Sequence, residues 1–169
     1  MATLLGEVSD FLASGPMKLF IGGQWGDAVR KGRFETRDPG TGKVLAEVAA
    51  AEQGDVDRAV EAAQQAFKKS GWPALPANDR AVILHRLADL IDKHQDILAQ
   101  IESLDVGKPI AQATSDIPSA SGTLRYYANL SVHTRRREPI AVSGHEAYTL
   151  RVPYGVCAVI VPWTFPFVL

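Results

Sequence analysis

An uncharged apolar run near the end of the 169-residue chain, Val156 to Val161, constrains the fold more than any other stretch. Gly155 precedes it and Pro162 follows it, and its short length and β-branched residues indicate a strand rather than a helix. Because no polar residue alternates with the apolar ones, we expect both faces of this strand to be buried, as in a parallel α/β sheet. Ligands bind beyond the carboxyl ends of such strands, so the stiff turn at 162–166, Pro-Trp-Thr-Phe-Pro, is a candidate binding loop.

Two pairs of short strands are predicted in the first 50 residues. Leu19 to Ile21 is typical of a strand, the glycines at 22 and 23 are typical of a tight turn, and Gln24-Trp25 begins the return strand. A second strand ends near Arg37, and the Asp-Pro-Gly-Thr-Gly segment after it supplies the backbone angles that turns need. Val44 to Val48 alternates as its partner.

Three helices are predicted after these strands. The first has Asp55 as its N-cap, carries an apolar stripe at helical spacing, and ends at Gly71. The second is long: it is capped by Asn78 or Asp79 and ends at Gly107-Lys108-Pro109. A third, shorter helix follows Asp116.

Residues Ile140 to Val152 have the pattern of a β-hairpin, with strand-like flanks on both sides of Ser143-Gly144. The basic run just before it, Arg135 to Arg137, is the densest cluster of positive charge in the chain. Three charges are too few for a nucleic-acid patch, and we interpret the run as a solvated entry to the hairpin.

Composition narrows the class of protein. With 46% hydrophobic and 22% charged residues and a net charge of −1, the chain is typical of a soluble globular protein, and neither nucleic acid nor a membrane is expected as a partner. No apolar stretch approaches the roughly 18 residues of a membrane span. The N-terminus lacks the basic start of a signal peptide, so Met1 to Pro16 is expected to be a weakly ordered leader. One cysteine, Cys157, allows no internal disulfide and fits a cytoplasmic location, and its place inside the apolar strand predicts a buried, unreactive thiol. The four histidines have no carboxylate-rich surroundings, so a zinc site is not expected.

A resemblance joins these observations. The segment P-Y-G-V-C-A-V-I-V-P-W-T-F-P-F resembles the P-x-G-V-x-x-x-I-x-P-W-N-F-P segment of the NAD(P)-dependent aldehyde dehydrogenases. The segments F-I-G-G-Q-W and D-P-G-T-G-K-V-L-A-E-V are also similar to the N-terminal part of that family, so the resemblance begins near Met17. It implies an α/β fold, the N-terminal part of the aldehyde dehydrogenase fold: small strands, three helices, an oligomerisation hairpin and the first strand of a Rossmann-like parallel sheet.

The resemblance also implies roles for particular residues. Thr164 occupies the position of the asparagine whose side-chain amide helps to stabilise the oxyanion, and a threonine hydroxyl at that position is expected to serve less well. Val161, Pro162, Trp163 and Thr164 match positions on the cofactor side of the loop, so NAD or NADP is the implied cofactor. Thr36, Arg37 and Asp105 match positions that hold a monovalent cation in some betaine-aldehyde-type members, with Arg37 able to offer only its carbonyl oxygen. The family's nucleophilic cysteine and general base are expected to lie in sequence beyond these residues, so Cys157 is not the expected nucleophile.

The predicted organisation has four parts: a leader at 1–16, the N-terminal part of a cofactor-binding domain at 17–134, an oligomerisation hairpin at 135–153, and a truncated strand and loop of the dinucleotide-binding sheet at 154–169. Two functions are compatible with it. The first is NAD(P)-dependent oxidation of an aldehyde to a carboxylate, with the isolated 169-residue chain itself inactive. The second is a non-catalytic fragment that binds aldehyde dehydrogenase subunits, or a second copy of itself, through residues 135–153.

Overall fold

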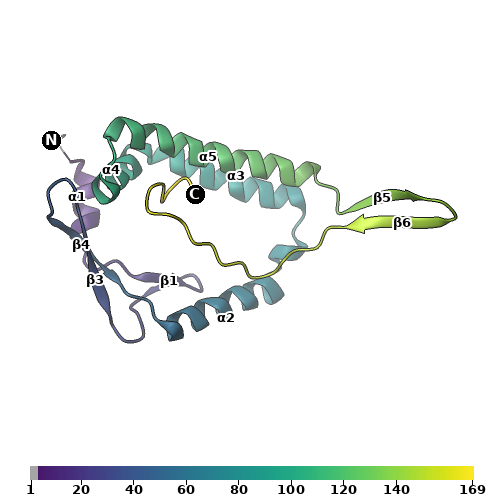
Figure 1. Cartoon of the computed structure of the whole chain (residues 1–169), viewed down its shortest axis with the longest axis horizontal. Coiled ribbons are helices and arrows are strands. Elements are labelled where there is room, and N and C mark those ends of the chain that lie inside the picture. Colours follow the sequence, from purple (N-terminus) through teal and green to yellow (C-terminus); the bar gives the residue numbers. More distant parts are fainter. Residues whose placement is uncertain (1–3) are drawn as a thin grey trace.

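The computed structural model describes residues 4–169. Helices α3, α4 and α5 form one layer, in which α3 and α5 lie side by side, and helix α2 with the first two strand pairs forms the other (Figure 1). The helices are α1 (Gly6–Ala13), α2 (Gln53–Lys69), the short 3-10 helix η1 (Trp72–Ala74), α3 (Ala77–Lys93), α4 (Gln95–Val106) and α5 (Ile110–His133). The strands are β1 (Leu19–Ile21), β2 (Gln24–Gly26), β3 (Arg33–Arg37), β4 (Val44–Ala49), β5 (Arg137–Val142) and β6 (His145–Leu150).

The described strands form three separate antiparallel pairs, and the predicted turns connect them. β1 pairs with β2 across the turn at Gly22-Gly23, where both glycines have positive φ angles of 61° and 82°. β3 pairs with β4 with a register shift beside Thr36. β5 pairs with β6 across Ser143-Gly144, and this hairpin projects away from the body of the molecule (Figure 1). The three hairpin predictions are therefore confirmed.

The predicted helix boundaries need three corrections. α2 starts at Gln53, and its N-cap is Glu52; Asp55 is instead the third helical residue, whose carboxylate accepts a hydrogen bond of 3.1 Å from the Glu52 N–H. The predicted long second helix is two helices, because the backbone at His94 leaves the helical region (φ −106°, ψ 21°). The third helix begins at Ile110, well before Asp116.

Helix α5 tolerates an internal proline through a side-chain substitute. Pro118 has no N–H to donate to the carbonyl of Thr114 four residues earlier. The side-chain amide of Gln95, on α4, donates a hydrogen bond of 3.0 Å to that carbonyl instead. This contact lets one 24-residue helix run through a position where sequence patterns expect a break.

Residues 4–16 do not form the weakly ordered leader that the sequence suggested. Residues 6–13 form α1, which contacts α4 and β4 and buries Val8 completely. The Leu5 N–H donates a 2.9 Å hydrogen bond to Oε1 of Gln100 on α4. Burial of one apolar side chain and a tertiary hydrogen bond order a segment whose own sequence signal is weak. Residues 1–3 of the predicted leader lie outside the described residues.

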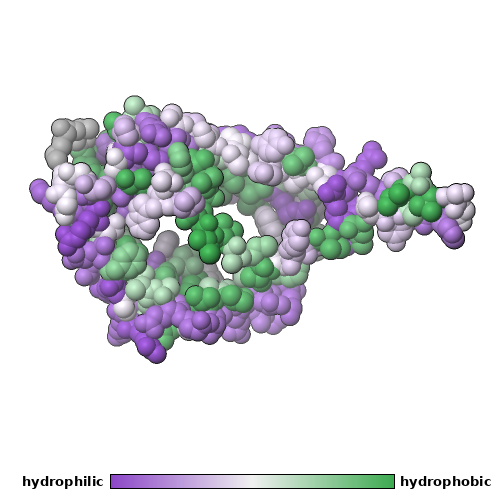
Figure 2. Space-filling model, viewed as in Figure 1, coloured by the Kyte–Doolittle hydropathy of each residue, from purple (hydrophilic) through white to green (hydrophobic). Residues whose placement is uncertain are grey.

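The buried core is small and consists largely of alanines. Ala99, Ala113 and Ile117 form its centre between α4 and α5, with Ile91, Leu98 and Phe167 packed around them. Many larger apolar side chains stay exposed instead, and Figure 2 shows such residues gathered around the hollowed middle of one face. None of the helices in residues 4–169 is long and apolar enough to cross a bilayer.

The apolar run at 156–161 is not the buried strand that its sequence predicted. It is extended but unpaired, and Ile160 is 96% exposed. Cys157, expected in the core, is exposed as well, with its Sγ 3.7 Å from the carbonyl oxygen of Gly155. A strand is stable only beside another strand, and no strand among residues 4–150 pairs with this one.

Candidate functional site

The predicted site residues 161–164 and Phe165 form the 161–165 loop, which contains most of the turn predicted at 162–166 and ends close to the helical layer (Figure 1). Val161 and Trp163 are exposed by 43% and 60%. Thr164 is also exposed, and its hydroxyl makes no hydrogen bond to any residue in the described range 4–169. The loop backbone turns at 163–168, where the Leu169 N–H lies 3.3 Å from the carbonyl oxygen of Phe165.

Two aromatic side chains attach this loop to the helices. The ring of Phe165 lies against Lys108, whose Nζ is 4.3 Å from the ring centroid. Phe167 packs against the core cluster of Ala99, Ala113 and Ile117. Because Trp163 and Thr164 lie beside Phe165, these two contacts set where the predicted cofactor and oxyanion residues lie.

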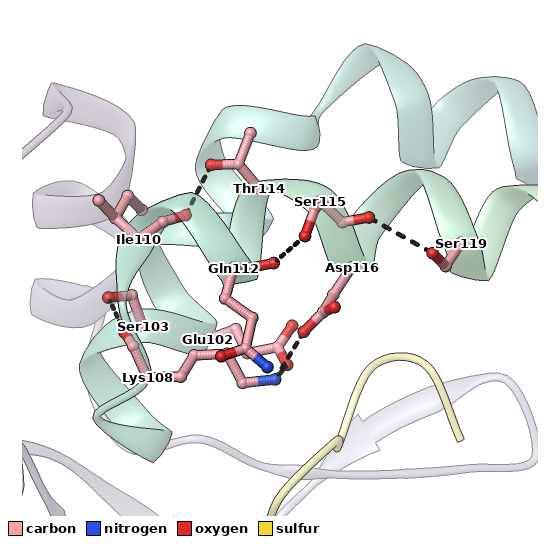
Figure 3. Close-up of polar contacts among 9 residues, drawn as sticks. All are labelled: Glu102, Ser103, Lys108, Ile110, Gln112, Thr114, Ser115, Asp116 and Ser119. Carbon is pink, nitrogen blue, oxygen red and sulfur yellow. Dashed lines mark hydrogen bonds and ion pairs between the residues drawn. The ribbon is translucent and has the colours of Figure 1, made fainter.

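Lys108 belongs to a buried charge cluster between α4 and α5 (Figure 3). Its Nζ donates to Oε1 of Glu102 at 2.5 Å and to Oδ2 of Asp116 at 2.8 Å. The exposed fractions of the three side chains are 7% for Lys108, 3% for Glu102 and 15% for Asp116. Burial lowers the pKa of Lys108, but the hydrogen bonds and charges of the two carboxylates outweigh burial and raise the pKa above its ordinary value. The lysine is therefore held in its charged form.

The connection between α4 and α5 positions Lys108. Gly107 ends α4 with φ 77°, a left-handed conformation suited to glycine. The Ser103 hydroxyl donates a 2.8 Å hydrogen bond to the carbonyl oxygen of Lys108 (Figure 3). Pro109 is the N-cap residue of α5. The sequence pattern treated Gly107-Lys108-Pro109 only as a helix end and missed this lysine. The sequence feature that could have indicated it is a lysine between two predicted helices, each of which carries acidic residues.

The structure brings together two of the three residues matched to a cation position. The Thr36 hydroxyl donates to Oδ1 of Asp105 at 2.5 Å, which joins β3 to α4. Arg37 does not join them through its side chain, which contacts the Glu35 carboxylate and the carbonyl oxygen of Gly42.

Beside this pair lies a cavity of about 160 Å³, lined otherwise by apolar side chains. A cation needs several oxygen ligands, and Thr36 and Asp105 supply the only polar side chains in the described lining. These residues by themselves do not fit a cation, whose binding here stays a prediction.

The described residues do not by themselves form a complete dinucleotide site. The 161–164 segment can offer backbone groups and the Trp163 ring surface to one portion of such a ligand. Within residues 4–169 there is no parallel sheet and no glycine-rich turn from a strand into a helix, the features that hold a dinucleotide pyrophosphate.

Comparisons with known proteins agree with this arrangement. Residues 25–169 match the model of the aldehyde dehydrogenase family. The chain is 42% identical over 153 residues to the mitochondrial benzaldehyde dehydrogenase of Antirrhinum majus, covering 90% of this chain and 29% of that protein. It is 42% identical over 155 residues to the mitochondrial aldehyde dehydrogenase of Equus caballus, covering 90% of this chain and 31% of that protein.

A solved structure is similar over nearly the whole chain. The NAD⁺ complex of an aldehyde dehydrogenase from Bacillus cereus superposes with a TM-score of 0.93 at 39% identity, covering 98% of this chain and 34% of that one. The chain therefore spans about a third of the length of the proteins it matches. The described α/β arrangement of helices and small antiparallel strand pairs is that of the N-terminal part of these enzymes. The chain belongs to the aldehyde dehydrogenase family.

Proposed function

We propose that this chain forms part of an enzyme that oxidises an aldehyde to a carboxylate with NAD⁺ or NADP⁺. The observation that carries the proposal is the Pro-Trp-Thr-Phe-Pro loop, exposed at Trp163 and Thr164 and anchored on the helices through Phe165. A nicotinamide cofactor supplies the hydride acceptor in such a reaction. The family match over residues 25–169 and the similarity to a protein solved with NAD⁺ support it.

Within this function, each loop residue has a proposed role. Val161, Pro162 and Trp163 contact the cofactor through backbone groups and ring surface. Thr164 faces the aldehyde oxygen and donates its hydroxyl hydrogen to the oxyanion that forms when a nucleophile adds to the carbonyl. Cys157 is exposed, but it lies in the extended run before the loop and is not the proposed nucleophile.

We infer that the 169 residues alone do not catalyse the reaction, because their one thiol is not placed for it. Assays of the purified chain are expected to show no NAD⁺-dependent aldehyde oxidation. Activity that disappears in the Cys157→Ala variant would contradict this inference. Binding of NAD⁺ to the isolated chain is best measured by calorimetry, with a Trp163→Leu variant as the matched comparison.

The role of Thr164 is testable in a hybrid that joins this chain to the remaining two-thirds of a close relative. Thr164→Asn introduces a side-chain amide, a longer donor than the threonine hydroxyl. Because the cofactor contacts involve backbone and ring surface, the Kd for NAD⁺ should stay nearly unchanged while kcat rises, by up to about 10²-fold. Equal kcat values for the hybrid with and without the Thr164→Asn substitution would show that this side chain is not the oxyanion donor, or that threonine already serves.

A second function, binding of another subunit, is favoured by the projecting hairpin. Ile140 and Val142 on β5 and Tyr148 and Leu150 on β6 are each about half exposed, which leaves apolar groups on both faces. Strands with free edges pair readily with other strands. We propose that residues 135–153 join this chain to a second copy or to another aldehyde dehydrogenase subunit. Sedimentation that gives a single monomeric species at high concentration would argue against it.

Two finer assignments complete the proposal. A betaine-aldehyde-type cation site at Thr36 and Asp105 rests on the family resemblance; their hydrogen bond brings the two side chains together but does not complete the ligand set of a cation. A cytoplasmic location is supported by the low cysteine content, while the similar proteins include mitochondrial ones.

A further inference from the structure

The contact between Lys108 and Phe165 joins two parts of the chain that are far apart in sequence. We propose that Lys108 is a positioning residue of the 161–165 loop: its ammonium group, fixed by Glu102 and Asp116, holds the Phe165 ring and, together with the packing of Phe167, sets the place of Thr164. The importance of Thr164 rests on the proposed function, but the attachment itself does not.

Lys108 is suited to this role because it cannot move easily. Two of its three N–H groups donate to carboxylates on different helices, α4 and α5. The cluster contains two carboxylates for one ammonium, and Oε2 of Glu102 has no hydrogen-bond partner among the described residues. The surplus negative charge makes loss or displacement of the cation costly, so the ammonium is a fixed point in the helical layer.

Phe165 is suited to it because its ring faces that fixed point. The Nζ of Lys108 is 4.3 Å from the ring centroid, within the roughly 6 Å range of a cation–π interaction. Phe165 is 36% exposed, so the contact is partly shielded from water. Cation–π interactions are stronger when they are shielded from water. The neighbouring Trp163 is 60% exposed and has no such partner in the described structure. Of the residues at 161–165, Phe165 therefore carries the attachment to the helices.

The attachment has a spectroscopic signature. Protons held over an aromatic ring are shifted upfield in NMR spectra. In the 169-residue chain, the ε-methylene protons of Lys108 should therefore resonate upfield of the usual chemical shift of a lysine ε-methylene. Phe165→Leu removes the ring but leaves the buried Lys108 cluster intact. We expect the upfield shift to vanish and the backbone order parameters at 163–165 to fall from the rigid value of about 0.85 toward about 0.6. The undocked population of the loop should rise about 2- to 30-fold.

Matched variants separate this role from general packing. Phe165→Tyr keeps the ring and should keep both the shift and the loop order. Trp163→Leu removes the adjacent ring and should leave the Lys108 signal unchanged. Lys108→Met should loosen the loop as Phe165→Leu does, and the double variant should loosen it no further than either single one. Should Lys108→Met prevent folding, the three loop variants still decide the question.

An ordinary chemical shift for Lys108 in the unmodified chain, or loop order that survives Phe165→Leu, would overturn the proposal. Both measurements use the chain without cofactor or substrate. A chain that binds no NAD⁺ but shows the shift would therefore count against the proposed enzyme function and leave the attachment standing.

Discussion

Replacing Lys108 by methionine should remove a large share of the free energy of unfolding of this chain. The substitution removes the ammonium from between Glu102 and Asp116, which are only 3% and 15% exposed. Breaking a buried ion pair by removing one partner typically costs about 3–5 kcal/mol, because the remaining charge is left without compensation. Native proteins have a free energy of unfolding of only about 5–15 kcal/mol. Lys108→Met should therefore leave a folded but marginal protein, or none.

Urea unfolding followed by circular dichroism measures this effect. With a urea dependence of about 2 kcal/mol/M, the unfolding midpoint should fall by about 1.5–2.5 M. The double variant Lys108→Met/Glu102→Gln removes one of the stranded charges and should recover part of the loss. Lys43→Met, at an exposed lysine, is the control and should change stability by less than about 0.5 kcal/mol. If Lys108→Met is no more harmful than Lys43→Met, the reasoning from burial and charge is refuted.

Three further perturbations follow from particular contacts. Gly107→Ala should destabilise the chain by more than the roughly 1–2 kcal/mol of left-handed backbone strain, because the new Cβ would lie 2.5 Å from Cγ of Pro39. Gly23→Ala is the control, because Gly23 has a similar φ but open space around it. In thermal melts, Gly23→Ala should lower the Tm only by the amount that the backbone strain explains. Gln95→Leu should cost about 1 kcal/mol in urea unfolding, because it strands the carbonyl that the helix proline leaves without its usual partner; no change would mean that water replaces the amide. The hydrogen bond from the Glu52 N–H is the main reason that the pKa of Asp55 lies below its ordinary 3.8. The stability that the ionised Asp55 contributes is therefore present above pH 3.8 and is lost as the pH falls through the lower pKa that Asp55 has in the folded chain. The difference in Tm between the unmodified chain and Asp55→Asn should therefore narrow below pH 3.8. A difference in Tm that stays constant would contradict this expectation.

Local turn chemistry made the strand pairs predictable. Ser143-Gly144 and Gly22-Gly23 lie where the structure turns, because glycine at positive φ determines the turn without help from distant residues. The helix boundaries were harder, since they depend on tertiary partners. The break at His94 has no proline or glycine to mark it, and the continuation of α5 through Pro118 depends on an amide from another helix.

The candidate site shows the same division. The turn at 162–166 was predicted from its residue types alone, whereas the association of Thr36 with Asp105, which are joined by a hydrogen bond, was predicted from the family resemblance. The exposure of the run at 156–161 was not predictable from its composition, because a strand is buried only where other strands and helices cover it. Lys108 was missed because a buried charge is recognisable only once its partners are placed around it.

The unpaired run at 156–161 has a consequence for the behaviour of this chain in a cell. Six uncharged residues, four of them β-branched and none of them proline, have the composition of segments that stack into cross-β fibrils. Here the backbone N–H and C=O groups of that segment have no neighbouring strand among the described residues, and Val159 and Ile160 are 77% and 96% exposed. We expect the exposed segment to act as a template for aggregation of the isolated chain. The run that leads into the candidate binding loop is thus also the part of the isolated chain that we expect to limit its solubility.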